Sequence, residues 1–349
     1  MRAITVVPRQ AGSARLDDVP EPDPSQGSVL VDGLALGICA TDGEIIRGEY
    51  AWAPPGEERL ILGHESLGRV RECPDDAGLS PGDLVVGIVR RPDPEPCACC
   101  ARGDWDFCRN GRYTERGIKE LHGYGSERWR VEPEFAVRID AGLEDVGVLL
   151  EPASVVAKAW EQIERIGGRS CFDAHRVLVT GAGPIGLLAA LLAAQRGYEV
   201  HVLDRVTGGP KPELVRRLGG TYHAGKVADV GEVDIVIEAT GVGKLVVDAL
   251  GATARNGIVC LTGVSSGERT VDLDIGGLNR TMVLENDVVF GSVNAARRHY
   301  EDAADALASA DRDWLRALIT RRVPLERWQE ALERRDNDVK VVVALDSTG

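Results

Sequence analysis

Four side chains that could bind a metal ion stand in short stretches of the first 151 residues. Cys39 lies in the stretch GICATD, His64 and Glu65 are adjacent in GHESLG, and Glu151 lies in LEP. A thiolate, an imidazole and a carboxylate can hold zinc and leave a fourth coordination position open, as catalytic zinc sites do. The spacing alone does not join residues so far apart. Taken singly, Cys39 would be a small buried apolar residue and His64 a hydrogen-bonded core histidine.

Three closely spaced cysteines form a second, local candidate for a metal site: Cys97, Cys100 and Cys108. A structural zinc needs a fourth ligand, for which Asp93 and Cys99 are the candidates. We favour Asp93, because adjacent cysteines such as Cys99 and Cys100 point their side chains apart in most backbone conformations. The alternative is a loop without metal that is prone to oxidation. In a cytosolic enzyme, cysteines crowded in this way indicate metal more often than disulfides.

A glycine-rich stretch, VLVTGAGPIG, carries the G-x-G-x-x-G pattern between an expected strand and an expected helix. Gly181 permits the tight turn, Gly183 lets the backbone approach a pyrophosphate, and Gly186 lets the helix pack closely on the strand. The N–H groups at the start of the helix face the anion. Asp204 ends the next expected strand, where an acid normally holds the adenosine ribose of a dinucleotide. The alternative is that these glycines serve only the turn.

The residues expected to contact the coenzyme extend beyond these glycines: Pro184, Ile185, Arg205 and Thr240. Repulsion between Asp204 and a 2′-phosphate predicts a preference for NAD+, with NADP+ usable at higher concentration. Arg205 is most simply interpreted as a surface residue that stacks on adenine. Its guanidinium could instead pair with the phosphate.

The elements that would position these residues change in character near residue 153. Before it, short strand-like runs at 29–36 and 84–89 without regular helix alternation predict a mostly β domain. After it, helices alternate with expected strands, which predicts a doubly wound parallel sheet. These strands are 176–180, 199–203, 234–238, 258–261 and 288–290. A helix over 297–310 and a strand over 340–345 follow, and this strand could return to the first sheet. The predicted domains are therefore 1–153 with 300–349, and 154–299.

The composition limits the classes of protein that the chain can belong to. Its 349 residues suffice for about two domains, and a hydrophobic fraction of 44% indicates a folded, globular protein. A formal net charge of −14 disfavours nucleic acid and anionic membranes as partners. We find no secretory signal and no apolar run long enough to span a bilayer. We therefore expect a cytoplasmic protein that acts on a small molecule as a homodimer or homotetramer.

Together these motifs resemble the zinc-dependent medium-chain dehydrogenases, and more narrowly their glucose dehydrogenase branch. The resemblance also rests on GDLV at 82–85, YTERGI at 113–118 and GSVNA at 291–295. The ERGI, EP and GSVN stretches are features of the sugar-oxidising branch. The resemblance implies an α/β protein with a GroES-like, mostly β catalytic domain and a Rossmann coenzyme domain. It also implies oxidation of an aldose at the anomeric carbon to a lactone, with hydride transfer to NAD(P)+.

Carried over residue by residue, the resemblance assigns roles to particular side chains. Cys39, His64 and Glu151 would hold the catalytic zinc, with Glu65 as an exchanging ligand or a neighbouring group. Thr41 matches the hydroxyl that relays the substrate proton. The sugar-binding positions are Glu115 and Glu151, and Asn294 matches a contact to the nicotinamide end.

Two positions depart from the family's pattern. In the family, the segment that corresponds to Asp93–Cys108, the cysteine lobe, usually begins with a cysteine. Asp93 stands at that first position here, which leaves the fourth ligand of the lobe open. Val155 stands where the family has an acidic sugar contact, which keeps a cyclitol, amino sugar or polyol as alternative substrates. A catalytically silent dinucleotide-binding scaffold is the alternative of another class. It is disfavoured because the zinc ligands and Thr41 are intact.

Overall fold

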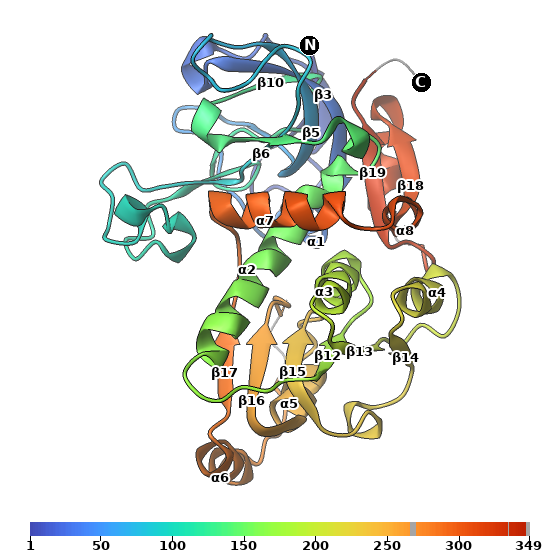
Figure 1. Cartoon of the computed structure of the whole chain (residues 1–349). Coiled ribbons are helices and arrows are strands. Elements are labelled where there is room, and N and C mark those ends of the chain that lie inside the picture. The colour runs from blue at the N-terminus through green and yellow to red at the C-terminus, as the bar shows by residue number, and fades with distance from the viewer. Residues whose placement is uncertain (266–269, 334, 347–349) are drawn as a thin grey trace. The chain divides into compact units, whose positions relative to one another are not determined.

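The computed structural model describes residues 1–265, 270–333 and 335–346, which contacts divide into two compact units (Figure 1). The first unit comprises Met1–Ser154, Asn294–Ser309 and the chain from Ile319 on, and the second comprises Val155–Val293 and Ala310–Leu318. The sequence analysis assigns residues 294–299 to the second domain and 310–318 to the first, and their contacts place each in the other unit. Residues 310–318 belong to the second unit because the buried Trp314 donates its Nε1 hydrogen to the Leu214 carbonyl, at 2.8 Å.

The main sheet of the first unit is completed by the C-terminal strand. Its order is β11-β6-β5-β3-β19-β18, and β10 also pairs with β3. The strands are β3 (Val29–Ile38), β5 (Glu65–Glu72), β6 (Leu84–Gly87), β10 (Arg128–Val131), β11 (Ala136–Ile139), β18 (Ile319–Pro324) and β19 (Lys340–Ala344). The three valines of β19 are buried, as expected for a strand with a neighbour on each side. Because β19 pairs antiparallel with β3, the expected return of the last strand is confirmed.

Smaller elements surround this sheet in the first unit. Two three-stranded sheets have the orders β2-β1-β4 and β7-β8-β9. Their strands are β1 (Arg2–Val6), β2 (Arg15–Asp18), β4 (Leu60–Ile61), β7 (Arg90–Arg91), β8 (Thr114–Arg116) and β9 (Glu120–Leu121). The helices are α1 (Ala40–Ile46) and α7 (Arg297–Ala308), and two short 3₁₀ turns, Cys100–Arg102 and Trp105–Phe107, lie in the cysteine lobe.

The second unit is built on a six-stranded parallel sheet of order β14-β13-β12-β15-β16-β17. The strands are β12 (Arg176–Thr180), β13 (Glu199–Leu203), β14 (Thr221–His223), β15 (Val233–Glu238), β16 (Thr253–Leu261) and β17 (Val288–Gly291). The helices are α3 (Pro184–Gln195), α4 (Pro210–Arg217), α5 (Gly243–Leu250), α6 (Ile275–Glu285) and α8 (Arg312–Leu318), and α2 (Leu150–Gly167) begins in the first unit and continues here. The chain progresses outward in opposite directions from β12, so the sheet is doubly wound, with its switch point between β12 and β15.

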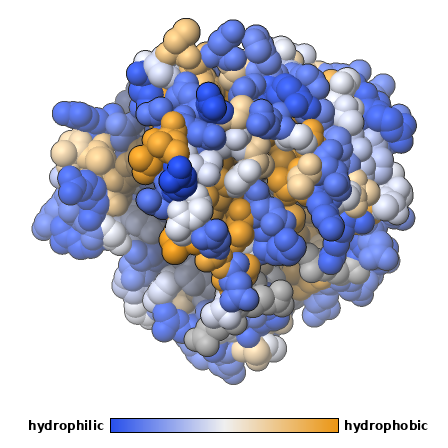
Figure 2. All heavy atoms as spheres, turned by 90° about the horizontal axis from the view of Figure 1, so that it is seen from below, coloured by the Kyte–Doolittle hydropathy of each residue, from blue (hydrophilic) through white to orange (hydrophobic). Residues whose placement is uncertain are grey.

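Two helices of the second unit differ in their burial. Helix α3 is apolar around its whole circumference, because residues 186–193 are all buried. Helix α6 exposes Ile275, Val283 and Leu284 to about two thirds of their surface. Figure 2, a view of the molecule from below, shows apolar residues among hydrophilic ones on that face.

Among the described residues, no helix combines the length and the apolar character that a membrane span needs.

Candidate active site and coenzyme site

The register between β3 and β5 brings three candidate zinc ligands together. Cys39 follows β3 directly, His64 precedes β5, and Glu65 pairs with Gly37 across the two strands. Cys39 Sγ lies 3.0 Å from His64 Nε2, and the ligand atoms of Cys39, His64 and Glu65 lie within 4.8 Å of one another. His64 and Glu65 are buried. A half-buried thiol with a buried imidazole and a buried carboxylate at these separations fits a zinc ion.

Asp42 organises this group, although the sequence analysis does not single it out. Its Oδ2 accepts the Cys39 backbone N–H at 2.9 Å, and its Oδ1 lies 3.5 Å from His64 Nδ1. Burial alone would lower the pKa of His64, but the nearby Cys39 and Asp42 raise it well above its ordinary value. A carboxylate behind a metal-binding imidazole fixes its ring orientation. The signal for Asp42 in the sequence was its place three residues after Cys39, the N-cap residue of α1, where an acidic side chain can accept the N-cap N–H.

Lys340 is a second residue at this site that the sequence analysis missed. Pairing of Val341 with Ile38 places Lys340 beside the end of β3. Its side chain is 1% exposed, and its ammonium donates to the Ile38 carbonyl at 3.1 Å and forms an ion pair with Glu65 Oε2. The buried Glu65 charge is thereby compensated within the protein.

Glu151, the third predicted zinc ligand, lies in the first turn of α2 and is 9% exposed. Burial raises its pKa to about 7, with His64 acting in the opposite direction and Glu65 in the same one. Its carboxylate does not join the three atoms that lie within 4.8 Å of one another. Glu65, which we expected as an exchanging ligand or a neighbouring group, thus joins Cys39 and His64 in the close group, whereas Glu151, which we expected as a ligand, does not. The role of Glu151 as a ligand stays a prediction.

The predicted sugar-binding residue Glu115 is part of a buried polar network. Its Oε1 accepts Nε and Nη2 of Arg90, at 3.1 and 2.9 Å, and Nδ2 of Asn294, at 2.8 Å. Arg90 also donates to the Asp106 carbonyl and lies 3.8 Å above the ring of Tyr113. Asn294, predicted to contact the nicotinamide, is therefore oriented by Glu115. Arg90 escaped the sequence analysis because only the pairing of β7 with β8 sets it opposite Glu115.

Thr41, the predicted proton relay, is half-buried in the first turn of α1, two residues after Cys39. The short helix fixes its backbone next to the candidate metal group. Its role in proton transfer stays a prediction.

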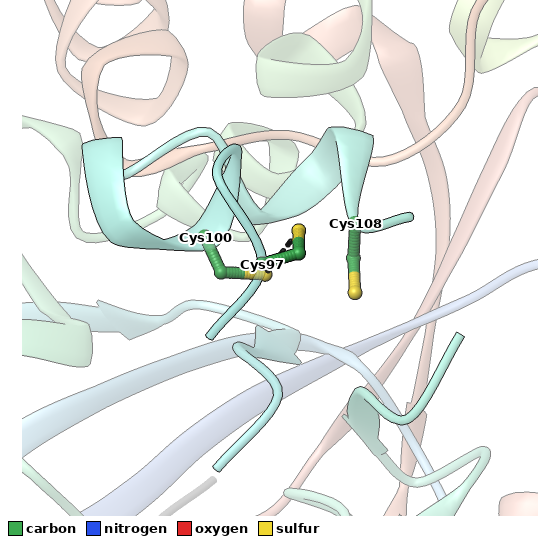
Figure 3. Close-up of side chains that lie close together, drawn as sticks. All are labelled: Cys97, Cys100 and Cys108. Carbon is green, nitrogen blue, oxygen red and sulfur yellow. Dashed lines mark hydrogen bonds between the residues drawn. The ribbon is translucent and has the colours of Figure 1, made fainter. Parts of the chain in front are cut away.

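The sulfur atoms of the cysteine lobe converge as predicted from their spacing. Cys97, Cys100 and Cys108 lie within 4.8 Å of one another, and the sulfurs of Cys97 and Cys100 are 3.6 Å apart (Figure 3). The Arg109 N–H, 3.4 Å from Cys97 Sγ, and other backbone N–H groups lower the pKa of Cys97 to about 6. Burial raises the pKa of Cys100 to about 11. Three convergent sulfurs supply three positions of a structural zinc tetrahedron.

Asp93 and Cys99 are the two candidates for the fourth ligand of the lobe. The Asp93 carboxylate, the favoured candidate, accepts Asn110 Nδ2 at 2.8 Å, Arg112 Nε at 3.2 Å and the Glu95 N–H at 2.9 Å. Within the described ranges, the close group contains the three sulfurs and neither Asp93 nor Cys99. A zinc ligand at Asp93 would require these hydrogen bonds to rearrange.

The glycine loop of the second unit joins β12 to α3 as the sequence predicts. Gly181 has a φ of 94°, which favours glycine. A Cβ on Gly186 would collide with the Gly181 carbonyl oxygen, whereas the space around Gly183 is open. Pro184 and Ile185 form the first turn of α3, where proline is well tolerated. The loop therefore leaves its backbone accessible for a phosphate group.

Asp204 follows β13 and is held firmly in place. Its Oδ2 accepts the Ala182 N–H of the glycine loop at 2.7 Å, and its Oδ1 accepts the Val206 N–H at 3.0 Å. Lys211 lies 3.3 Å from the same Oδ2. Burial would raise the pKa of Asp204, but these N–H groups and Lys211 hold it below its usual value. Arg205 beside it is exposed.

Thr240 follows β15 and is fixed by Glu238, another residue that the sequence analysis missed. Glu238 is fully buried, and its Oε1 accepts the Thr240 N–H at 2.7 Å and the Thr240 hydroxyl. Its carboxylate also accepts the Gly241 N–H, at 3.1 Å from Oε2. Glu238 thus shapes the loop in which Thr240 is predicted to contact the coenzyme.

Comparisons with known proteins agree along the whole chain. The model of the glucose dehydrogenase C-terminus matches residues 144–345, and that of the alcohol dehydrogenase GroES-like domain matches residues 25–141. Glucose 1-dehydrogenase of Methanocella arvoryzae is 40% identical, over 99% of each chain. The chain belongs to the glucose dehydrogenase family. Another glucose dehydrogenase relative, from Thermoproteus tenax, is 42% identical over 98% of this chain and 99% of the other.

A solved structure of the glucose dehydrogenase family shares the fold. The glucose dehydrogenase of Haloferax mediterranei, in complex with NADP, Zn and gluconolactone, is 33% identical, covers 100% of both chains and has a TM-score of 0.91. The expected family and the combination of GroES-like and Rossmann domains are confirmed. As a member, the chain is an NAD(P)-dependent oxidoreductase of the alcohol dehydrogenase type.

Proposed function

We propose that this chain is a zinc-dependent dehydrogenase that oxidises glucose, or a glucose-like aldose, at the anomeric carbon to the lactone. The hydride passes to NAD(P)+. The observation that carries the proposal is the close group of the half-buried Cys39 and the buried His64 and Glu65, in a chain whose relative was solved in complex with NADP, Zn and gluconolactone. A thiol–imidazole–carboxylate set in one unit and a dinucleotide-type fold in the other are the parts that such a reaction needs.

Different residues of the first unit would hold the zinc, orient its histidine ligand and transfer the substrate proton. Cys39 and His64, with Glu65 or Glu151, would hold the zinc, and Asp42 would keep the imidazole in its orientation. When bound, zinc stabilises the alkoxide that forms as the hydroxyl loses its proton. Thr41 would receive that proton and pass it towards solvent.

Recognition of the sugar would depend on the Glu115 network. Arg90 and Asn294 both bind Oε1 of Glu115, which leaves Oε2 to accept a sugar hydroxyl. Burial of the network makes its hydrogen bonds selective, because a substrate without the matching hydroxyl leaves the carboxylate oxygen unpaired.

In the second unit, the Gly181–Gly186 loop would bind the pyrophosphate of the coenzyme, and Asp204 would accept the ribose hydroxyls. On this basis NAD+ is the preferred coenzyme and NADP+ is usable. Thr240 and Asn294 would contact the coenzyme from β15 and from the chain after β17.

A second substrate class is supported by one specific position. Val155 offers no hydrogen bond where the family's pattern has an acidic sugar contact. A cyclitol, an amino sugar or a polyol intermediate would place different groups there, and is therefore the alternative substrate.

The test is reduction of NAD+ and NADP+ by the zinc-loaded protein across a panel of aldoses, polyols and amino cyclitols. We expect an aldose to give the highest kcat/KM and to yield a lactone. The Cys39→Ser variant should lose turnover while it still binds coenzyme. Turnover of cyclitols or polyols in preference to every aldose would select the alternative. Coenzyme binding without turnover of any substrate would indicate a scaffold.

The assembly and location complete the proposal. A homodimer or homotetramer is supported by the exposed apolar side chains of α6 and by β17, the end strand of its sheet. A cytoplasmic location is supported by the thiols of the cysteine lobe, which stay reduced there.

A further inference from the structure

A lysine that the sequence analysis did not consider lies against Asp204. Gly209, with a φ of 75°, reverses the chain after β13, and α4 then begins at Pro210. Lys211, in the first turn of α4, directs its ammonium back to Asp204 Oδ2, at 3.3 Å. The two side chains are only 14% and 11% exposed. The pair is therefore a fixed feature of the coenzyme unit and not a chance contact at the surface.

The carboxylate of Asp204 cannot easily turn away from a ligand. One oxygen is bound by the Ala182 N–H and the other by the Val206 N–H. The Tyr222 hydroxyl donates to the Val206 carbonyl and holds the same segment. A 2′-phosphate on the ribose, with about two negative charges, would thus meet a fixed negative charge unless a cation compensates for it.

Lys211 supplies that compensation. Asp204 and Lys211 together are neutral, and the exposed Arg205 adds one positive charge at the same end of β13. Among the described residues Arg205 has no ion pair, so it would have to be ordered by the ligand, at a cost in side-chain entropy. Lys211 is already ordered. Moving its ammonium from the carboxylate to a neighbouring phosphate needs only a small rotation of its flexible stem.

We propose that Lys211 is the specificity-determining residue that admits the 2′-phosphate of NADP+ to a site whose acid otherwise selects NAD+. This inference rests on the proposed function only in taking the second unit to bind NAD(P)+. With NAD+, Lys211 stays paired to Asp204 while the ribose hydroxyls approach. With NADP+, it bridges Asp204 and the phosphate, and Arg205 covers the phosphate from the solvent side.

The test measures binding of 2′,5′-ADP and of 5′-ADP, two fragments that differ in the 2′-phosphate, together with NADP+ and NAD+. Calorimetry on the whole protein without sugar keeps the result independent of turnover. Lys211→Gln should weaken 2′,5′-ADP and NADP+ about tenfold or more, the loss of one hydrogen bond to a charged group. It should leave 5′-ADP and NAD+ within about twofold. Lys211→Arg should restore most of the lost affinity.

The matched control is Arg216→Gln, which removes one positive charge from the same helix at a position paired with Glu213. It should change neither selectivity nor affinity by more than about twofold. Equal weakening of all four ligands by Lys211→Gln would overturn the proposal and give Lys211 a purely structural role. Unchanged binding of 2′,5′-ADP would overturn it in favour of Arg205. If the zinc-loaded parent protein oxidises no sugar while Lys211→Gln still weakens 2′,5′-ADP and NADP+ selectively, the result would count against the proposed function and not against this inference.

Discussion

Removing the cation beside Glu65 tests how the active-site carboxylate is tolerated in the interior. In Lys340→Met, a side chain of similar length replaces the buried ammonium, so Glu65, 3% exposed, loses its compensating charge. Burial would lower the pKa of Lys340, but Glu65 and Cys39 raise it, so the lysine is charged in the folded protein. Breaking a buried ion pair at one partner costs about 3–5 kcal/mol. We expect a loss of that size in the metal-free protein.

The assay is native-state hydrogen exchange at the amides of β3 and β19, which reports on this sheet alone. Since about 1.4 kcal/mol is a factor of ten, a loss of about 3–5 kcal/mol should lower protection there by about two to three and a half orders of magnitude. Combining Lys340→Met with Glu65→Gln removes both charges and should recover most of the loss. Added zinc should also recover part of it, because a metal beside Glu65 replaces the missing cation.

The control is Lys119→Met, which removes a lysine of the same unit whose ammonium donates to the Gly111 carbonyl at the surface. It should cost less than about 1 kcal/mol. The reasoning is refuted if Lys340→Met costs no more than Lys119→Met. It is also refuted if the double variant with Glu65→Gln is as unstable as the sum of its single variants.

The remaining predictions concern the two candidate zinc sites and the coenzyme. His64→Ala should remove one zinc per chain and abolish turnover but keep coenzyme binding, since the glycine loop lies in the other unit; normal turnover of a folded variant would contradict this. If the cysteine lobe is metallated, the protein should contain two zincs per chain, and Asp93→Ala should lower the metal content more than Cys99→Ala. The reverse order would identify Cys99 as the fourth ligand. Asp204→Gly should shift the ratio of kcat/KM values about tenfold from NAD+ towards NADP+, and a parent that already favours NADP+ tenfold would refute it.

Local signals in the sequence predicted much of the coenzyme unit. The glycines between β12 and α3 and the β-branched strands depend on neighbours in the chain, so pattern and turn chemistry sufficed. The convergence of Cys97, Cys100 and Cys108 was predictable for the same reason. The family resemblance, rather than any spacing, joined Cys39 to His64.

Partners set by strand register were not predictable. Lys340 meets Glu65 because β19 pairs with β3, and Arg90 meets Glu115 because β7 pairs with β8. Neither pairing can be read from one segment, since a shift of one residue would turn each side chain to the other face. Asp93 is a case in which sequence position alone was not sufficient. Its position suggested a zinc ligand, but side chains and a backbone N–H nearby donate hydrogen bonds to its carboxylate.

The place of β19 has a consequence for synthesis of the chain on the ribosome. The second unit lies entirely before the last strand in the sequence, so it can fold while β3 still lacks β19, one of its neighbours in the sheet. Until β19 emerges, Glu65 lacks the ammonium of Lys340 that pairs with it in the folded protein. We therefore expect a chain truncated before β19 to bind zinc more weakly at Cys39, His64 and Glu65, although all three residues have by then been translated.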